Sequence, residues 1–168
     1  MNYHRILHDD TLNGDGLRVV LFLSGCDHHC EGCHNPQTWD PNSGKPFDIE
    51  AYDELWYYLS KDYTSGITFS GGDPLNPANI DGVYRLCKEI KENCPEKTIW
   101  LYSGYDVYEI LTNPEHRKIM EYVDVLVDGK FKKELLDVKY PWAGSTNQRV
   151  IDMQKTLDKG TIIMHKNT

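Results

Sequence analysis

The chain has 168 residues, of which 18 are Lys or Arg and 26 are Asp or Glu, so its formal net charge is 18 minus 26, or -8 at pH 7 with histidines uncharged. Its length predicts a single domain over residues 1–168, with a core that needs no disulfide bonds. The acidic balance argues against binding to nucleic acid or to an anionic membrane, because both require a basic face. No apolar run approaches the roughly 18 residues of a membrane span, and the polar N-terminus lacks the apolar core of a signal peptide, so we expect a cytoplasmic protein.

The first half of the chain alternates strand and helix around one long loop. Residues 17–23 form a short apolar run that predicts a buried strand. Prolines and glycines over residues 26–46 forbid a long regular element, so this stretch is predicted as a loop. Asp48 is the expected cap of a helix over residues 49–59, whose apolar side chains recur at helical spacing. A second strand is predicted over residues 66–69.

The second half continues the same alternation. The predicted elements are, in chain order, a helix over 79–93, a strand over 97–102, two short helices over 107–111 and 115–121, and a strand over 123–127. The tail is predicted to add a strand over 149–153 and a shorter one over 161–164. Strands that alternate with helices at this spacing indicate an α/β fold with a largely parallel sheet.

Each of the four main strands ends in a polar or glycine-rich turn. These turns are the cysteine-bearing loop after residue 23 and residues 70–74, 103–105 and 128–130. Parallel strands place their carboxyl ends on one edge of the sheet, where α/β proteins build their sites. We therefore expect four loops to converge on one mouth.

Three of the five cysteines, Cys26, Cys30 and Cys33, lie within eight residues in a CxxxCxxC pattern. Three thiolates on one loop can each bind a corner of a 4Fe-4S cube, which leaves the fourth iron without a protein ligand from this segment. Zinc is the competing metal, and a closed zinc site would take its fourth ligand from one of the neighbouring histidines, His28, His29 and His34.

The other two cysteines do not complete a zinc pattern. Zinc sites usually pair two short cysteine knuckles far apart in the sequence. Cys87 lies on the apolar stripe of its predicted helix, and Cys94 follows seven residues later. The spacing therefore favours a 4Fe-4S cluster, with zinc as the alternative.

Further motifs follow the cysteines in order along nearly the whole chain. They are residues 13–36, Gly71-Gly72-Asp73-Pro74, and residues 100–105, 127–131 and 144–152. With these motifs the chain resembles the radical S-adenosylmethionine activases of glycyl-radical enzymes. Within that family it is most similar to the members that act on an anaerobic ribonucleoside-triphosphate reductase.

The resemblance implies a fold and a reaction. The fold is a partial, open β/α barrel of the radical S-adenosylmethionine type, whose open side suits a macromolecular substrate. In this family Cys26, Cys30 and Cys33 hold the 4Fe-4S cluster, and the amino and carboxylate groups of S-adenosylmethionine bind the fourth iron. Reductive cleavage of that cofactor then gives methionine and a 5'-deoxyadenosyl radical, which abstracts a hydrogen atom from a backbone glycine of the reductase.

The resemblance also implies the residues that bind S-adenosylmethionine. They are Gly71, Gly72 and Asp73 in the turn that holds the methionine amino group, Ser103 after the third strand, and Asp128 and Lys130 after the fourth. Taken alone, the Gly71-Gly72 segment is also typical of a plain strand-to-helix turn, and the Asp128 segment of a solvated Asp-Gly turn. Gly32 stands where the wider superfamily often has an aromatic residue near adenine, so adenine must be held elsewhere.

Several expectations complete the interpretation. An external electron donor, such as a flavodoxin-like protein, is implied because the sequence has no flavin or nicotinamide fingerprint. Arg18 and Arg149 are weaker candidates that either pair a carboxylate or form surface ion pairs, and the three histidines are expected to be partly exposed. The alternatives are an activase of another glycyl-radical enzyme, such as a formate-lyase type, and a non-catalytic zinc or iron-sulfur binding module.

Overall fold

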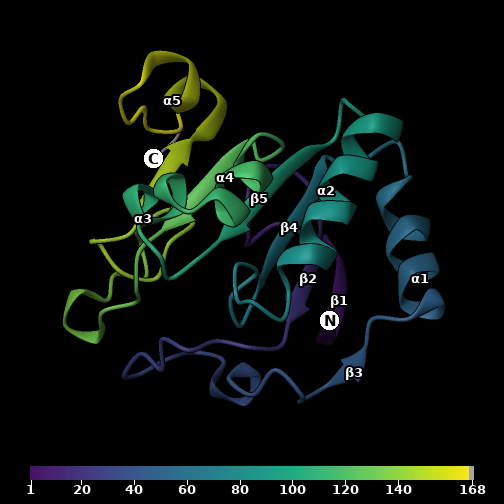
Figure 1. The fold of residues 1–168 in the computed structure, drawn as a ribbon, viewed down its shortest axis with the longest axis horizontal. Coiled ribbons are helices and arrows are strands. Elements are labelled where there is room, and N and C mark those ends of the chain that lie inside the picture. The colour runs from purple at the N-terminus through teal and green to yellow at the C-terminus, as the bar shows by residue number, and fades with distance from the viewer. Residues whose placement is uncertain (167–168) are drawn as a thin grey trace.

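A seven-stranded open sheet organises the chain, which a computed structural model describes over residues 1–166 (Figure 1). The strands are β1 (Asn2–Asp10), β2 (Arg18–Leu23), β3 (Lys45–Pro46), β4 (Gly66–Gly71), β5 (Thr98–Tyr102), β6 (Val125–Asp128) and β7 (Arg149–Asp152). The helices are α1 (Ile49–Leu59), α2 (Ile80–Asn93), α3 (Val107–Thr112), α4 (Pro114–Met120) and α5 (Met153–Lys159), with 3-10 turns at Pro36–Thr38 and Lys133–Leu135.

The middle of the sheet is parallel and its edges are antiparallel. The strand order is β3-β1-β2-β4-β5-β6-β7, and β2, β4, β5 and β6 run parallel to one another. β1 pairs antiparallel with both β2 and β3, and β7 pairs antiparallel with β6. The predicted α/β class and mostly parallel sheet are confirmed, and the linear order from β3 to β7 leaves the sheet open.

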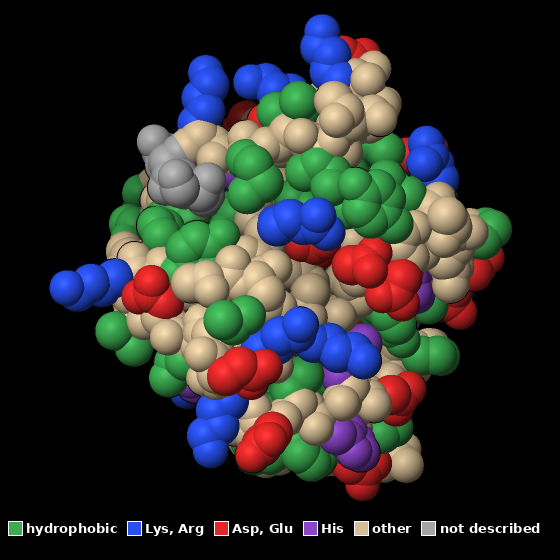
Figure 2. Space-filling view, turned by 90° about the vertical axis from the view of Figure 1, so that its left-hand side faces the viewer, with side chains coloured by type: hydrophobic (Ala, Val, Ile, Leu, Met, Phe, Trp, Pro, Cys, Tyr) green, Lys and Arg blue, Asp and Glu red, His purple; other side chains and the backbone are tan. Residues whose placement is uncertain are grey.

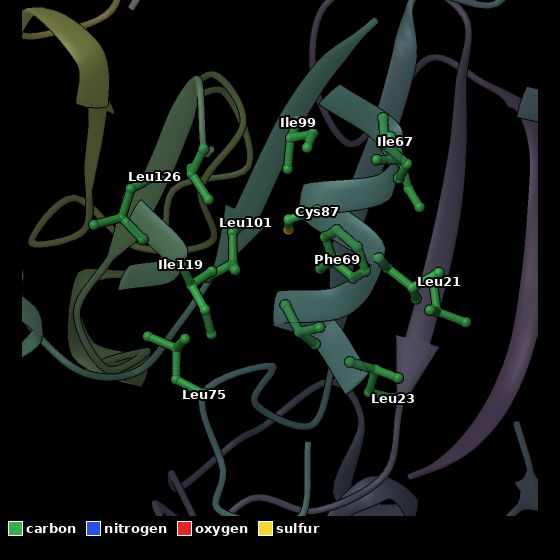
Figure 3. Packing of buried hydrophobic residues seen from close by; sticks show 14 of the residues in the cluster. Leu21, Leu23, Ile67, Phe69, Leu75, Cys87, Ile99, Leu101, Ile119 and Leu126 are labelled. Atoms are coloured by element: carbon green, nitrogen blue, oxygen red, sulfur yellow. The ribbon is translucent and has the colours of Figure 1, made fainter. Parts of the chain in front are cut away.

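The helices cover one face of this sheet. Strand side chains such as Leu21, Phe69 and Leu101 point toward the helices and are fully buried, and Cys87 of α2 meets them in the same apolar cluster (Figure 3). α1 begins where the sequence predicts, because the Asp48 carboxylate accepts a hydrogen bond from the backbone N–H of Ala51 at 3.0 Å. The helices therefore fix the strand positions from one side only.

Loops cover the opposite face. Trp100, Val127 and Val150 form a second, smaller apolar cluster there, against which Trp142 packs. Successive strand residues alternate between the two faces. Since helices cover one face and loops cover the other, β2 is buried along its whole length. The face covered by loops is the one that contributes to the cavity described below.

Three parts of the fold differ from the sequence expectations. β1 lies in a segment for which the polar sequence gave no strand prediction, and only Tyr3 of its nine residues is buried. The tail strand is confirmed as β7, but Met153 begins α5, capped by Asp152. The predicted strand over 161–164 is wrong: only a single bridge, between Ile151 and Met164, forms there. Within residues 1–166, no helix combines the length and the apolar character needed to cross a membrane.

Candidate functional site

A cavity of about 280 Å³ lies at the carboxyl ends of the parallel strands. Its walls come from all four loops that the sequence predicts to converge. The lining includes Cys26, Cys30 and Cys33 after β2, Gly71, Gly72 and Asp73 after β4, Ser103 and Gly104 after β5, and Gly129 and Phe131 after β6. The convergence of the four loops on one mouth is therefore confirmed.

The three clustered cysteines are free thiols, each partly exposed, that line this one cavity. Backbone hydrogen bonds hold their loop: the N–H of Cys26 donates to the carbonyl of Trp39 at 3.0 Å, and the N–H of Cys33 donates to that of Cys30 at 3.1 Å. Burial raises the pKa of Cys26 to about 11 and also raises the pKa of Cys30. Metal binding at these thiols therefore releases protons.

The donor chemistry of the three thiols fits a multi-iron cluster. Among residues 1–166, no group of three or more His, Cys, Asp or Glu side chains converges as it would around a single metal ion. A 4Fe-4S cube does not require such convergence, because each thiolate binds a different iron. Three thiols on one cavity wall, with open space beside them, have the donor chemistry that a three-cysteine cluster needs.

The Gly71-Gly72 turn brings two loops into close backbone contact. Gly71 has a φ of 98°, and a Cβ added there would lie 2.4 Å from the backbone nitrogen of Leu23. A Cβ on Gly72 would lie 2.6 Å from the carbonyl oxygen of Gly25, the residue before the first cysteine. Both glycines line the cavity, and both are also required to seat the turn against the start of the cysteine loop.

Asp73 joins three of the loops. Its buried carboxylate accepts hydrogen bonds from Ser103 Oγ at 3.0 Å, from the N–H of Gly104 at 2.9 Å and from the N–H of Leu75 at 2.9 Å. His28 Nε2 lies 2.7 Å from the same carboxylate. Since a carboxylate only accepts, His28 Nε2 is the donor. Asp73 and Ser103 are thus brought together, and their side chains hydrogen-bond each other.

His28 is more buried than the sequence indicated. The residue as a whole is partly exposed, as expected, but its side chain is only 7% exposed. The imidazole packs edge-on against Tyr105, with ring centroids 4.6 Å apart, and sits directly over Gly104. His29 and His34 are exposed as expected. The bond from His28 to Asp73 ties the cysteine loop to the turn after β4.

Asp128 and Lys130 are not brought into the cavity lining. Asp128 is buried, forms an ion pair with Arg149 at 2.7 Å and accepts a hydrogen bond from the N–H of Val107 at 2.8 Å. Arg149 thus pairs a carboxylate, and this hydrogen bond raises the pKa of its guanidinium. Lys130 is exposed, and its charge acts on Cys30 in the direction that lowers the pKa of that thiol.

Several lining residues were missed by the sequence analysis. Trp39 stacks on His29, with ring centroids 4.3 Å apart, and so supports the cysteine loop. Gln148 accepts hydrogen bonds from the N–H groups of Gly144 and Ser145 and donates to the carbonyl of Gly129 at 3.0 Å. The motif at residues 144–152 was the available signal for Gln148, whereas no local pattern marks Trp39.

Comparisons with known proteins agree with this geometry. Residues 12–151 match the family described as a 4Fe-4S single cluster domain. The chain is 45% identical to the anaerobic ribonucleoside-triphosphate reductase-activating protein of Enterobacteria phage T4, over 89% of this chain and 93% of that protein. The proteins of the same name from Vibrio cholerae and Escherichia coli K12 are each 42% identical, over 88% and 89% of this chain and 96% and 97% of theirs.

Proposed function

Because this chain belongs to the family of anaerobic ribonucleoside-triphosphate reductase-activating proteins and carries a 4Fe-4S single cluster domain, we propose that it activates such a reductase by generating a glycyl radical on it. The chain is then an activating enzyme of the radical S-adenosylmethionine type. The observation that carries this proposal is the convergence of three free cysteines and a two-glycine turn on one cavity.

In this proposal Cys26, Cys30 and Cys33 would hold the cluster, and S-adenosylmethionine would bind next to it in the same cavity. A cluster held there would supply the electron for reductive cleavage of S-adenosylmethionine, and the radical chemistry toward the reductase glycine would belong to these cofactors. The protein's own task is to position these groups and to exclude competing reactions.

The remaining predicted residues divide into two roles. Gly71 and Gly72 present backbone to the methionine end of the cofactor, and the ammonium of Lys130 attracts its carboxylate. Asp73 and Ser103 hold the turns around it, because their polar groups already bond one another. Asp128 acts at a distance by holding the loop of Gly129 through its pairs with Arg149 and Val107. We further propose that the open sheet is the partial barrel of this family.

The proposed activity also requires an electron donor and a reducing compartment. The chain would receive single electrons from a flavodoxin-like donor and would work in the reducing cytoplasm, where free thiols persist. Its five free cysteines support this setting.

The test is anaerobic reconstitution with iron and sulfide, followed by addition of dithionite and S-adenosylmethionine. We expect about four irons per chain and release of 5'-deoxyadenosine, and a glycyl radical detected by electron paramagnetic resonance once the reductase is added. Cys94→Ala is the matched control, because Cys94 lies outside the cavity lining. A chain that binds the irons but releases no 5'-deoxyadenosine would contradict the proposal. A radical formed only on a formate-lyase-type enzyme would move it to the alternative substrate.

A further inference from the structure

Residues 130–140, here called the lysine loop, expose several apolar side chains. Val138 is 89% exposed, Leu136 is 50% exposed and Leu135 is 39% exposed. Phe131, in the same loop, lines the cavity itself. Apolar side chains exposed together on one short loop mark a contact surface more often than single exposed residues do.

The lysine loop is basic, although the chain is acidic. It carries Lys130, Lys132, Lys133 and Lys139 against Glu134 and Asp137, so its net charge is 4 minus 2, or +2, whereas the whole chain has -8. The loop lies at the left edge of Figure 1, and the view of that side in Figure 2 shows Lys and Arg side chains interspersed with hydrophobic and acidic ones. This local reversal of charge selects for an acidic partner.

The loop is held in this exposed conformation by bonds to the segment that follows it. Leu136 and Ser145 form a β-bridge, and the N–H of Thr146 donates to the carbonyl of Leu135 at 3.0 Å. The hydroxyl of Tyr140 donates to the carbonyl of Gln148 at 2.8 Å, and Gln148 lines the cavity. The exposed side chains are therefore presented from a fixed position relative to the cavity.

We propose that the lysine loop is the docking surface for the reductase, and that it receives an acidic segment with apolar anchors that lies next to the radical glycine. This inference rests on the proposed function. The glycine must enter the cavity, and the lysine loop reaches it at Phe131, which lines it, while Lys133 packs against Gly32 of the cysteine loop. The lysines steer the partner and the apolar side chains become buried in it.

The experiment uses two variants that leave the cavity intact. Lys132→Glu/Lys139→Glu reverses two exposed charges, and Val138→Asp removes the most exposed anchor. Lys130 and Lys133 are left unchanged because they lie beside the cysteines. The matched control is Lys88→Glu/Lys159→Glu, which makes the same change in net charge on α2 and α5.

All assays use dithionite as the reductant, so that docking of a protein electron donor does not enter the result. For each docking variant we expect about a tenfold rise in the reductase concentration that gives half-maximal glycyl-radical formation, and a weaker salt dependence for the charge variant. Release of 5'-deoxyadenosine without the reductase should match that of the unchanged protein, and the control variant should behave normally in both assays.

The outcomes separate the two proposals. If the unchanged protein releases no 5'-deoxyadenosine, the proposed function fails. If it does, and the docking variants form the glycyl radical at normal reductase concentrations, the docking proposal is overturned while the function stands. Variants that are normal with dithionite but impaired with a flavodoxin-like donor also overturn it, and assign the lysine loop to the donor. An equal effect of the control variant would show that only net charge matters, which also contradicts the proposal.

Discussion

The two ends of the parallel strands both bury charged side chains, and Arg18 and Asp73 show that they use them differently. At the amino end, Arg18 is fully buried and donates to the side chains and carbonyls of β4 and β5. At the carboxyl end, Asp73 is equally buried but accepts from loops. Arg18 joins β2 to β4 and β5, whereas Asp73 joins loops to one another.

The amino end is therefore built for stability. Arg18 donates to Thr68 Oγ1 at 2.9 Å, and to Thr98 Oγ1 and the carbonyls of Ile67 and Thr98 at 2.8 Å. A further bond reaches the carbonyl of Asp15, and the guanidinium lies over Trp100. Burial lowers the pKa of Arg18 to about 10, so the group stays charged at neutral pH. The expectation of a surface ion pair is wrong at this position.

At the carboxyl end, groups other than the cysteine thiols hold the loops together. The Asp73 carboxylate collects His28, Ser103 and the N–H of Gly104, so the three loops are fixed without using the cysteine thiols. The amino end of the sheet thus serves stability, and the carboxyl end serves the chemistry of the site. Substitutions at the two ends should separate stability from activity.

The largest effect is expected from Cys26→Ala, Cys30→Ala or Cys33→Ala. Each removes one iron ligand, and we expect release of 5'-deoxyadenosine to fall by at least about 1000-fold, because the chemistry belongs to the bound cofactors. The free energy of unfolding of the metal-free protein should change by less than about 0.5 kcal/mol, since these thiols lie outside the apolar core. Iron content, product release and urea unfolding measure the three quantities. Retained activity in any one variant would contradict the assignment of these cysteines as iron ligands at the carboxyl end of the sheet.

Arg18→Met should give the reverse pattern. Removing the guanidinium leaves buried oxygens of Ile67, Thr68 and Thr98 without their donor, and we expect a loss of about 3 kcal/mol in the free energy of unfolding. Urea unfolding measures this loss. The folded fraction should keep its specific rate of product release. A strong loss of that rate with unchanged stability would show that the amino end also serves the reaction.

Asp73→Asn should lower activity more than stability. The amide keeps the size of the side chain but supplies a single acceptor oxygen where the carboxylate has two. Loss of such support typically lowers activity about 10- to 100-fold, and the stability cost should be about 1 to 2 kcal/mol. Steady-state product release beside urea unfolding gives both numbers. Unchanged kinetics would show that the loops hold their positions without Asp73.

The smallest effect concerns the reactivity of the thiols in the metal-free protein. Alkylation requires the thiolate, and burial raises the pKa of Cys26 to about 11, so its rate of alkylation should keep rising with pH up to that value. Burial also raises the pKa of Cys87, which is fully enclosed, so Cys87 should stay unmodified while the protein is folded. Mass mapping after iodoacetamide treatment at several pH values tests both. Early modification of Cys87 would contradict the packing around α2.

The sequence predicts the features that are local. Strands with glycine-rich ends, the cap at Asp48 and the spacing of three cysteines each depend on neighbouring residues, and the structure places all of them as expected in the fold. His28 is held by Asp73, 45 residues away, and Arg18 is held by Thr68, 50 residues away, among other distant partners, so no local pattern could show their burial. Asp128 follows the same rule, since its partner Arg149 comes from β7.

Transfer of the glycine hydrogen tests the central claim most directly. A reductase prepared with α-deuterated glycine is incubated anaerobically with the reconstituted chain, S-adenosylmethionine and dithionite, and the 5'-deoxyadenosine is examined by mass spectrometry. The account predicts that the released 5'-deoxyadenosine carries deuterium and that its amount follows the glycyl radical. Unlabelled 5'-deoxyadenosine, formed while the glycyl radical accumulates, would contradict it.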